Sequence, residues 1–207
     1  MKSILIIGAG GLGKETVDLI RDIGGYEIAG FLDDNVEKKD RVINGVPVLD
    51  TVDRLEQYGN VEDIVIAIAN PAIRRKIYEY SSAMGFRYPN LVHPMVVRGS
   101  NVKMGMGNII YAYSILSTDV MLQDFVIINP QCGIGHESGI GSFTTLYWNV
   151  HVGGNTSILE SCELGSKACV IQGLHVMDNV VLGAGAVVVE DIHDSGTYAG
   201  VPARKIK

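Results

Sequence analysis

Aliphatic residues recur at every sixth position through the second half of this chain. The aliphatic track is Met104, Ile110, Leu116, Leu122, Ile128, Ile134, Ile140, Leu146, Val152, Ile158, Leu164, Val170, Val176, Leu182 and Val188. A second track lies four residues after the first, from Asn108 to Ile192, and consists mostly of Ser, Thr, Cys, Ala and Val. Neither an α-helix nor an alternating strand has a period of six. A parallel β-helix of hexapeptide repeats does, because each hexad forms one flat wall and one corner around a narrow interior.

Three hexads make one triangular coil of eighteen residues, so the fifteen hexads predict five coils. Strands of stacked coils lie about 4.8 Å apart, which predicts a prism roughly 24 Å tall. Residues eighteen apart are then stacked, and Cys132 and Cys162 fall on the small interior track. We therefore predict that residues 91–207 form an all-β, left-handed parallel β-helix with a C-terminal tail.

The first ninety residues have a different pattern, in which short apolar runs alternate with helical spacing. Continuous apolar runs are typical of buried parallel strands, and a strand–helix alternation predicts a small parallel sheet with right-handed crossovers. Residues 1–90 are thus expected to form a small Rossmann-like α/β domain that residues 88–97 connect to the β-helix. The predicted strands are 3–7, 28–32 and 63–69, with a brief extended segment at 46–48. The predicted helices lie near 17–23, 52–58 and 73–84.

Composition narrows the functional classes. A net charge of −6 and a pI of about 5.3 give no basic surface for a nucleic acid or an anionic membrane. Three cysteines are too few for a disulfide framework, which favours a reducing cytoplasm. Neither a signal sequence nor a membrane span is expected, and no metal site, because the five histidines do not converge within one coil stack.

A glycine-rich turn follows the first predicted strand. Gly8, Gly10 and Gly13 match G-x-G-x-x-G, and Asp33-Asp34 end the second predicted strand twenty residues later. Such a turn brings backbone amides close to phosphates, while the acidic residues are suited to hydrogen bonding a ribose or a base. Three interpretations stay open: a nucleotide-linked ligand, which we favour, a nicotinamide cofactor, and a purely structural turn. The domain is too short for a full dinucleotide fold.

One corner of the predicted β-helix carries candidate catalytic residues. His136 lies two positions after the interior residue Ile134, with Glu137 next to it. Stacking places Gly154 above His136 and Gln172 above Gly154, which predicts a groove along this edge. A histidine with a carboxylate partner is typical of a general base near neutral pH. A solvent-exposed pair without function is the alternative.

Two aromatic residues, Tyr147 and Trp148, fall at corner or outward positions. Exposed aromatic residues on such a scaffold favour either a subunit contact or a ligand-stacking surface, and we expect the contact.

With these residues in view, the chain resembles the bacterial sugar N-/O-acyltransferase family, which includes sialic-acid O-acetyltransferases and UDP-4-amino-sugar N-acetyltransferases. The likeness spans nearly the whole chain. It rests on the Gly8–Gly13 turn, Phe31-Leu-Asp-Asp34, Ala67-Ile-Ala-Asn70, Asn129, Gly135-His-Glu137, Gly153-Gly-Asn155, Leu182-Gly-Ala-Gly-Ala186 and Ala199-Gly-Val-Pro-Ala-Arg204.

The resemblance implies a homotrimer with active sites between neighbouring β-helices and acetyl-CoA as the co-substrate. His136 is then the general base and Glu137 its partner. The implied substrate-binding residues are Gly10, Gly11, Leu12, Asp33, Asp34, Ala69 and Asn129. The implied coenzyme A contacts are Thr145, Gly154, Ser166 and Ala184.

The chain departs from some members of that family at two positions. Thr145 stands where those members have a second histidine, nine residues after the base, that contacts the acetyl carbonyl. A threonine hydroxyl can donate the same hydrogen bond, as can backbone amides. Leu12 replaces another histidine in the glycine turn and offers no hydrogen bond to a sugar or phosphate.

We therefore expect an acetyl-CoA-dependent N-acetyltransferase acting on a nucleotide-activated amino sugar for surface glycan synthesis. O-acetylation of sialic acid or another sugar hydroxyl stays open as a close alternative. A non-catalytic trimer that binds nucleotide sugars and an NAD-linked oxidoreductase are the alternatives from other classes.

Overall fold

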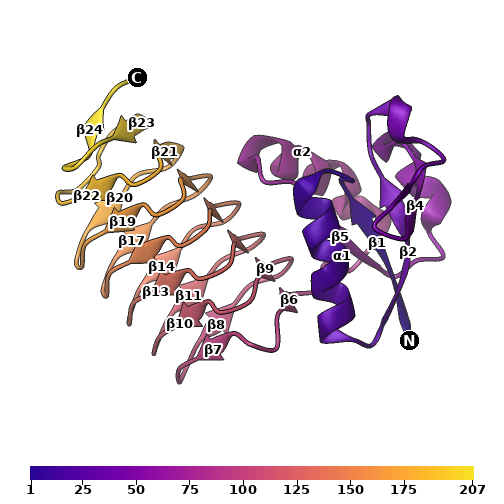
Figure 1. Ribbon diagram of the computed structural model, residues 1–207, viewed down its shortest axis with the longest axis horizontal. Helices are drawn as coiled ribbons and strands as arrows, with labels where there is room; N and C mark the ends of the chain where they lie inside the picture. The colour runs from indigo at the N-terminus through magenta and orange to yellow at the C-terminus, as the bar shows by residue number, and fades with distance from the viewer. The chain divides into compact units, whose positions relative to one another are not determined.

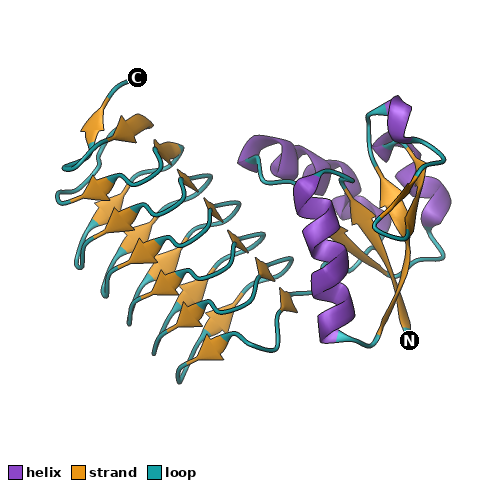
Figure 2. Ribbon diagram, viewed as in Figure 1, coloured by secondary structure: helices purple, strands orange, loops and turns teal.

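A computed structural model describes all 207 residues of the chain. The residues separate into two compact units, Met1–Leu91 and Val92–Lys207 (Figure 1). All the helices lie in the first unit, and the second consists of short strands joined by turns (Figure 2). No helix is long and apolar enough to cross a membrane.

The first unit has a five-stranded sheet with the order β3-β4-β2-β1-β5. The strands are β1 (Lys2–Ile7), β2 (Tyr26–Leu32), β3 (Val42–Ile43), β4 (Val46–Asp50) and β5 (Asp63–Ile66). β1 pairs in parallel with both β2 and β5, and β2 pairs in parallel with β4. Only β3 is antiparallel, in a hairpin with β4 that turns at Asn44-Gly45. The carboxyl ends of the parallel strands therefore meet at one edge of the sheet.

Two α-helices accompany this sheet, α1 (Gly11–Ile23) and α2 (Pro71–Ser81). The segments Val36–Lys38, Val52–Tyr58 and Ser82–Met84 are 3₁₀ helices. The sequence therefore placed a helix correctly at 52–58 but not its type. The third strand is shorter than expected, because it ends at Ile66 and the chain turns before the Asn70 side chain caps the amide of Ile73 in α2.

The second unit is a parallel β-helix with three walls. Wall 1 contains β7 (Val97–Arg98), β10 (Ile115–Leu116), β13 (Gly133–Ile134), β16 (His151–Val152), β19 (Cys169–Val170) and β22 (Val187–Val188). Wall 2 contains β8 (Lys103–Met104), β11 (Met121–Leu122), β14 (Gly139–Ile140), β17 (Ser157–Ile158) and β20 (His175–Val176). Wall 3 contains β6 (Leu91–Val92), β9 (Ile109–Ile110), β12 (Ile127–Ile128), β15 (Thr145–Leu146), β18 (Glu163–Leu164), β21 (Val180–Leu182), β23 (Gly196–Ala199) and β24 (Arg204–Lys205).

The register between coils is eighteen residues throughout the regular part, so the predicted stacking is confirmed. Ile115, for example, pairs with Gly133, which pairs with His151. All the aliphatic-track residues after Met104 are buried and form one continuous core. The two cysteines of the small track are buried in it, as expected. The hexapeptide period therefore fixes both the strand register and the interior.

Polar residues on the small track bind the backbone of neighbouring coils. The Ser138 hydroxyl donates to the carbonyl of Gly153 at 2.8 Å and accepts from the amide of Thr156 at 3.2 Å. Thr144 makes the equivalent pair of bonds to Leu159 and Cys162. No buried side-chain nitrogen or oxygen is left without a hydrogen bond. These residues therefore tie successive coils together without the cost of an unsatisfied polar group.

The β-helix begins two hexads earlier than the aliphatic track indicated, with β6 and β7. β6 and β7 lie within the segment that we expected to be a connection, and Val92, Val96 and Val102 pack against the core. Arg98 occupies the position where the track requires an aliphatic residue. That single exception hid the first two hexads from the sequence pattern.

Candidate functional site

The glycine turn brings β1, β5 and α1 into close contact. A Cβ atom on Gly13 would lie 2.0 Å from the carbonyl oxygen of Gly8, so α1 can approach β1 only with glycine there. Gly10 and Gly11, by contrast, face open space and have exposed surfaces. No side chain caps α1 at its N-terminus, and Leu12 contributes no polar side chain. The turn therefore leaves room for a ligand to approach backbone amides, the arrangement that binds phosphate groups.

The two aspartates at the end of β2 have different surroundings. Asp33 accepts hydrogen bonds from the amides of Ala9 at 2.7 Å and Asn35 at 3.0 Å, and pairs with the Lys38 ammonium at 3.0 Å. Partial burial opposes ionisation, but these bonds outweigh it and hold the pKa of Asp33 below its usual value. Asp33 thus fixes the glycine turn to the edge of the sheet. The sequence predicted a contact with the substrate for Asp33 but not this structural role.

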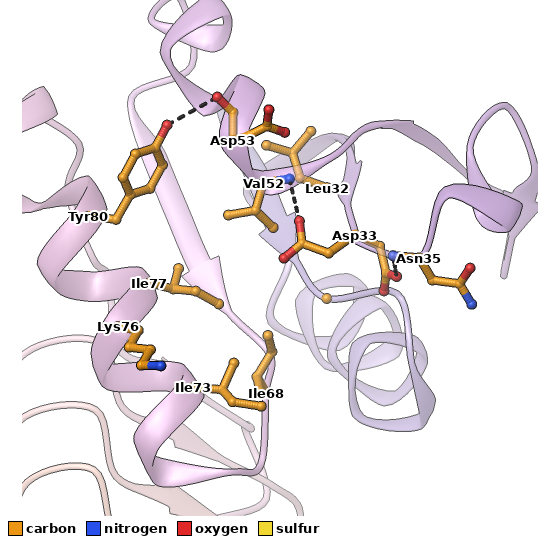
Figure 3. Close-up of a pocket in the computed structure, with 12 residues that line it drawn as sticks. Leu32, Asp33, Asn35, Val52, Asp53, Ile68, Ile73, Lys76, Ile77 and Tyr80 are labelled. Atoms are coloured by element: carbon orange, nitrogen blue, oxygen red, sulfur yellow. Dashed lines mark hydrogen bonds between the residues drawn. The ribbon is translucent and has the colours of Figure 1, made fainter.

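Asp34 keeps more of its carboxylate available. One oxygen accepts a hydrogen bond from the amide of Val52 at 2.9 Å, while the residue as a whole is exposed. Asp34 is one of the residues that line a cavity of about 520 Å³ at the carboxyl edge of the sheet. Figure 3 shows this cavity. Leu32 and Ile68 line this cavity from strand ends, and Ile77 lines it from α2. An apolar pocket with a few polar groups at one edge suits a flat, polar ring such as a nucleobase.

Sequence reasoning missed the part of the cavity that α2 contributes. Ile73, Lys76, Ile77 and Tyr80 all line it. Their spacing of three and four residues is that of one helical face, so the helical pattern contained this information. Ala69, which we predicted to bind substrate, does not line the cavity; its carbonyl accepts a bond of 2.8 Å from the Arg74 guanidinium.

The second candidate site is the corner between wall 1 and wall 2. The Nδ1 atom of His136 lies 3.0 Å from a carboxylate oxygen of Glu137, and both side chains are 64% exposed. A Cβ atom on Gly154 would lie only 2.5 Å from Nε2 of His136. The imidazole ring therefore rests directly against Gly154. The ring occupies the space beside Gly154. Next to this corner, Gly135, Gly153 and Gln172 line a cavity of about 460 Å³ along wall 1.

This geometry suits a general base. Glu137 fixes the orientation of the ring through Nδ1, and the Nε2 atom stays at the surface of the corner next to Gly154. When the Nδ1–H group donates a hydrogen bond to a carboxylate, the neutral ring has its free lone pair on Nε2. The pair can thus remove a proton from a ligand that lies along the corner.

Within one chain, the β-helix does not bring the predicted coenzyme A contacts Ser166, Ala184 and Thr145 to this corner. Ser166 and Ala184 stack at the corner between wall 3 and wall 1, in one column with Trp148. Thr145 opens β15 on wall 3, which lies across the prism from the corner of His136, and it is buried. Gln172, the third residue of the predicted column, lies above Gly154 as expected. Its backbone amide is close to Gly153.

Asn129 serves the scaffold. Its side-chain amide donates to the carbonyl of Leu146 at 2.9 Å, and the residue is 4% exposed. The Tyr147 hydroxyl donates a hydrogen bond to the Glu163 carboxylate at 2.8 Å, so this side chain also contacts the scaffold. The Trp148 side chain, by contrast, is 47% exposed. No three His, Cys, Asp or Glu side chains gather closely enough to hold a metal ion.

Comparison with known proteins agrees with this arrangement. Residues 3–81 match the family described as the PglD N-terminal domain. The acetyltransferase domain of PglB from Neisseria gonorrhoeae FA1090 superposes with a TM-score of 0.93 and 36% identity over 100% of both chains. PerB from Caulobacter crescentus, solved with CoA and GDP-perosamine, superposes with a TM-score of 0.76 and 27% identity, over 99% of this chain and 97% of PerB.

Among curated proteins, a GDP-perosamine N-acetyltransferase from Escherichia coli O157:H7 is 29% identical over 98% of this chain and 95% of its own length. The PglB domain has also been solved in complex with acetyl coenzyme A. The fold, the His-Glu corner and these full-length similarities lead to one conclusion. The chain belongs to the bacterial sugar acetyltransferases that join a PglD-type N-terminal domain to a left-handed β-helix.

Proposed function

We propose that this protein transfers the acetyl group of acetyl-CoA to the amino group of a nucleotide-linked amino sugar, a step in surface glycan synthesis. The observation that carries the proposal is the His136–Glu137 pair at 3.0 Å, with the imidazole packed on Gly154. The relatives support it, because PerB binds CoA and GDP-perosamine and a curated relative is a GDP-perosamine N-acetyltransferase.

The reaction needs no covalent enzyme intermediate, and His136 carries one proton from the amine to the departing thiolate. The acceptor amine attacks the thioester carbonyl carbon while Nε2 of His136 accepts a proton from the amine nitrogen. The tetrahedral intermediate then expels coenzyme A as the thiolate, which takes up the proton from the imidazolium. Glu137 keeps the ring oriented and stabilises its positive charge while the proton resides there. The amide product and coenzyme A result.

We further propose that the nucleotide end of the substrate binds in the cavity of the first unit. The open backbone at Gly10 and Gly11 would bind the phosphates, and Asp34 would accept a hydrogen bond from the base or ribose. Asp33 would act indirectly, because its oxygens already hold the glycine turn.

The proposed coenzyme A contacts suggest an assembly. Gly154 lies at one corner of the prism, and Ser166 and Ala184 lie at another. A coenzyme A molecule bound in a groove between two copies would contact both sets. The exposed Trp148 and Tyr113 supply apolar surface for such a contact. We therefore propose a homotrimer, which light scattering would report at three times 22.3 kDa, about 67 kDa.

The proposal is tested by thiol release from acetyl-CoA in the presence of UDP-, GDP- and CMP-linked amino sugars. His136→Ala should lower kcat at least about a hundredfold, the usual contribution of a general base. His175→Ala is the matched control, because His175 is exposed at the start of β20, two coils above the coil that contains His136. An unchanged rate in His136→Ala would refute the mechanism. Mass spectrometry with hydroxylamine treatment, which cleaves an ester but not the amide, distinguishes O- from N-acetylation.

A further inference from the structure

Lys76 supplies the only cationic side chain among the residues that line the cavity of the first unit. It is an exposed residue of α2, one turn after Ile73 and one turn before Tyr80. Its side chain projects from α2 toward the space that it shares with Ile73 and Ile68 (Figure 3). Its ammonium group makes no hydrogen bond or ion pair with the protein. The cavity therefore offers one unpaired positive charge.

The carboxylates of the cavity are in the opposite condition. Asp33 is neutralised by Lys38 at 3.0 Å and by two amides. Asp34 accepts from the amide of Val52, and Asp53 pairs with the Arg54 guanidinium at 3.8 Å. None of these three carboxylates forms an ion pair with Lys76. Asp33 and Asp53 thus each have a cationic partner, whereas the ammonium group of Lys76 has no anionic partner.

A UDP- or GDP-linked amino sugar without a carboxylate carries its negative charge on the diphosphate. The glycine turn offers that group neutral backbone amides, because Gly10, Gly11 and Leu12 have no charged side chain. Two phosphate charges entering a cavity lined by three aspartates need a counter-charge from the protein. A lysine ammonium is a common phosphate ligand, acting as a point charge.

We infer that Lys76 binds the diphosphate of the nucleotide-linked substrate and determines the affinity for diphosphates over uncharged nucleosides. This inference rests on the proposed function, since it assigns a further residue to the same substrate. Nothing in the catalytic step depends on it, because Lys76 would act on binding and not on proton transfer at His136.

Calorimetric titration with UDP, GDP, uridine and guanosine tests the inference. Lys76→Gln should weaken binding of the preferred diphosphate about tenfold, and high salt should reduce this difference, because it screens exposed charges. Lys76→Arg keeps the charge and should stay within about threefold of the original protein. The corresponding nucleoside should bind equally to all variants.

The control is Lys2→Gln, which removes an exposed lysine at the amino end of β1, the other edge of the sheet. Equal diphosphate affinity in Lys76→Gln, or an equal loss for the nucleoside, would overturn the inference, as would a wild-type protein that binds no diphosphate. Diphosphate binding that depends on Lys76 but is accompanied by no acetyl transfer would instead defeat the proposed function alone. Circular dichroism of each variant verifies that the fold is retained.

Discussion

Gly154 offers a way to displace the catalytic imidazole without touching it. Replacing Gly154 with alanine adds one methyl group, whose carbon would lie 2.5 Å from Nε2, 2.8 Å from Cε1 and 2.9 Å from Cδ2 of His136. Ordinary contacts between such atoms begin near 3.4 Å. The ring must therefore move by about 0.9 Å or rotate away. Since the His136 side chain is 64% exposed, it can do so into solvent.

The consequence should be large for catalysis and small for stability. The methyl group meets a mobile side chain rather than backbone, so we expect the melting temperature of Gly154→Ala to change by less than about 3 °C, within the range of ordinary surface substitutions. A displacement of about 1 Å in a reacting group costs on the order of a hundredfold in rate. We therefore expect kcat in the thiol-release assay to fall between about tenfold and a hundredfold.

A control and a refuting result complete the design. Gly139→Ala adds a methyl group to β14, where nothing lies within 4 Å of the new carbon, and should leave kcat unchanged. Comparing kcat with KM for acetyl-CoA separates displacement of the imidazole from obstruction of coenzyme A. Unchanged kcat in Gly154→Ala, or a loss confined to KM, would refute the idea that Gly154 seats the ring.

Three further outcomes follow from the structure. Glu137→Gln should lower kcat by roughly tenfold to a hundredfold and leave KM for acetyl-CoA unchanged. The reason is that a hydrogen bond to a charged group contributes about 1.5–3 kcal/mol, which corresponds to that range of rates. Arg74→Met should lower the free energy of unfolding in urea by about 3 kcal/mol, because the buried guanidinium satisfies the carbonyls of Ile68 and Ala69 at 2.6 and 2.8 Å. At pH 8 a thiol reagent should modify only Cys169 in the native protein and all three cysteines in urea. The reason is that burial raises the pKa of Cys132 and Cys162 to about 11. Rapid modification of a second thiol in the native protein would contradict this expectation.

Most of the β-helix could be predicted because every hexad must meet the same packing requirement. The interior accepts one bulky and one small side chain per hexad, so the pattern is visible in fifteen consecutive repeats. The first two hexads were missed because Arg98, an exposed residue, occupies the aliphatic position. The type of the 52–58 helix was missed for a different reason. Both α and 3₁₀ helices bury residues three apart, here Val52 and Leu55, so the spacing does not separate them.

The candidate site was predictable only where stacking places residues. The eighteen-residue register put Gly154 above His136, but the direction of the imidazole ring depends on a side-chain rotation that no spacing contains. The roles of Asp33 and Asn129 were likewise hidden. Each makes hydrogen bonds to backbone groups distant in sequence, Ala9 for Asp33 and Leu146 for Asn129, and these require the folded chain.

The corner conformation explains why neighbouring residues can act together. In an extended strand, adjacent side chains point to opposite faces, and His136 and Glu137 would then be separated. Glu137, however, has a φ of 58°, one of a series of left-handed residues that recur every six positions at the corners. This turn of the chain allows the Glu137 carboxylate to reach Nδ1 of His136 at 3.0 Å. The left-handed conformation costs a non-glycine residue about 1–2 kcal/mol, and glutamate lacks the short side chain that eases this cost for asparagine. A glycine at 137 would relieve this cost but remove the carboxylate that orients His136.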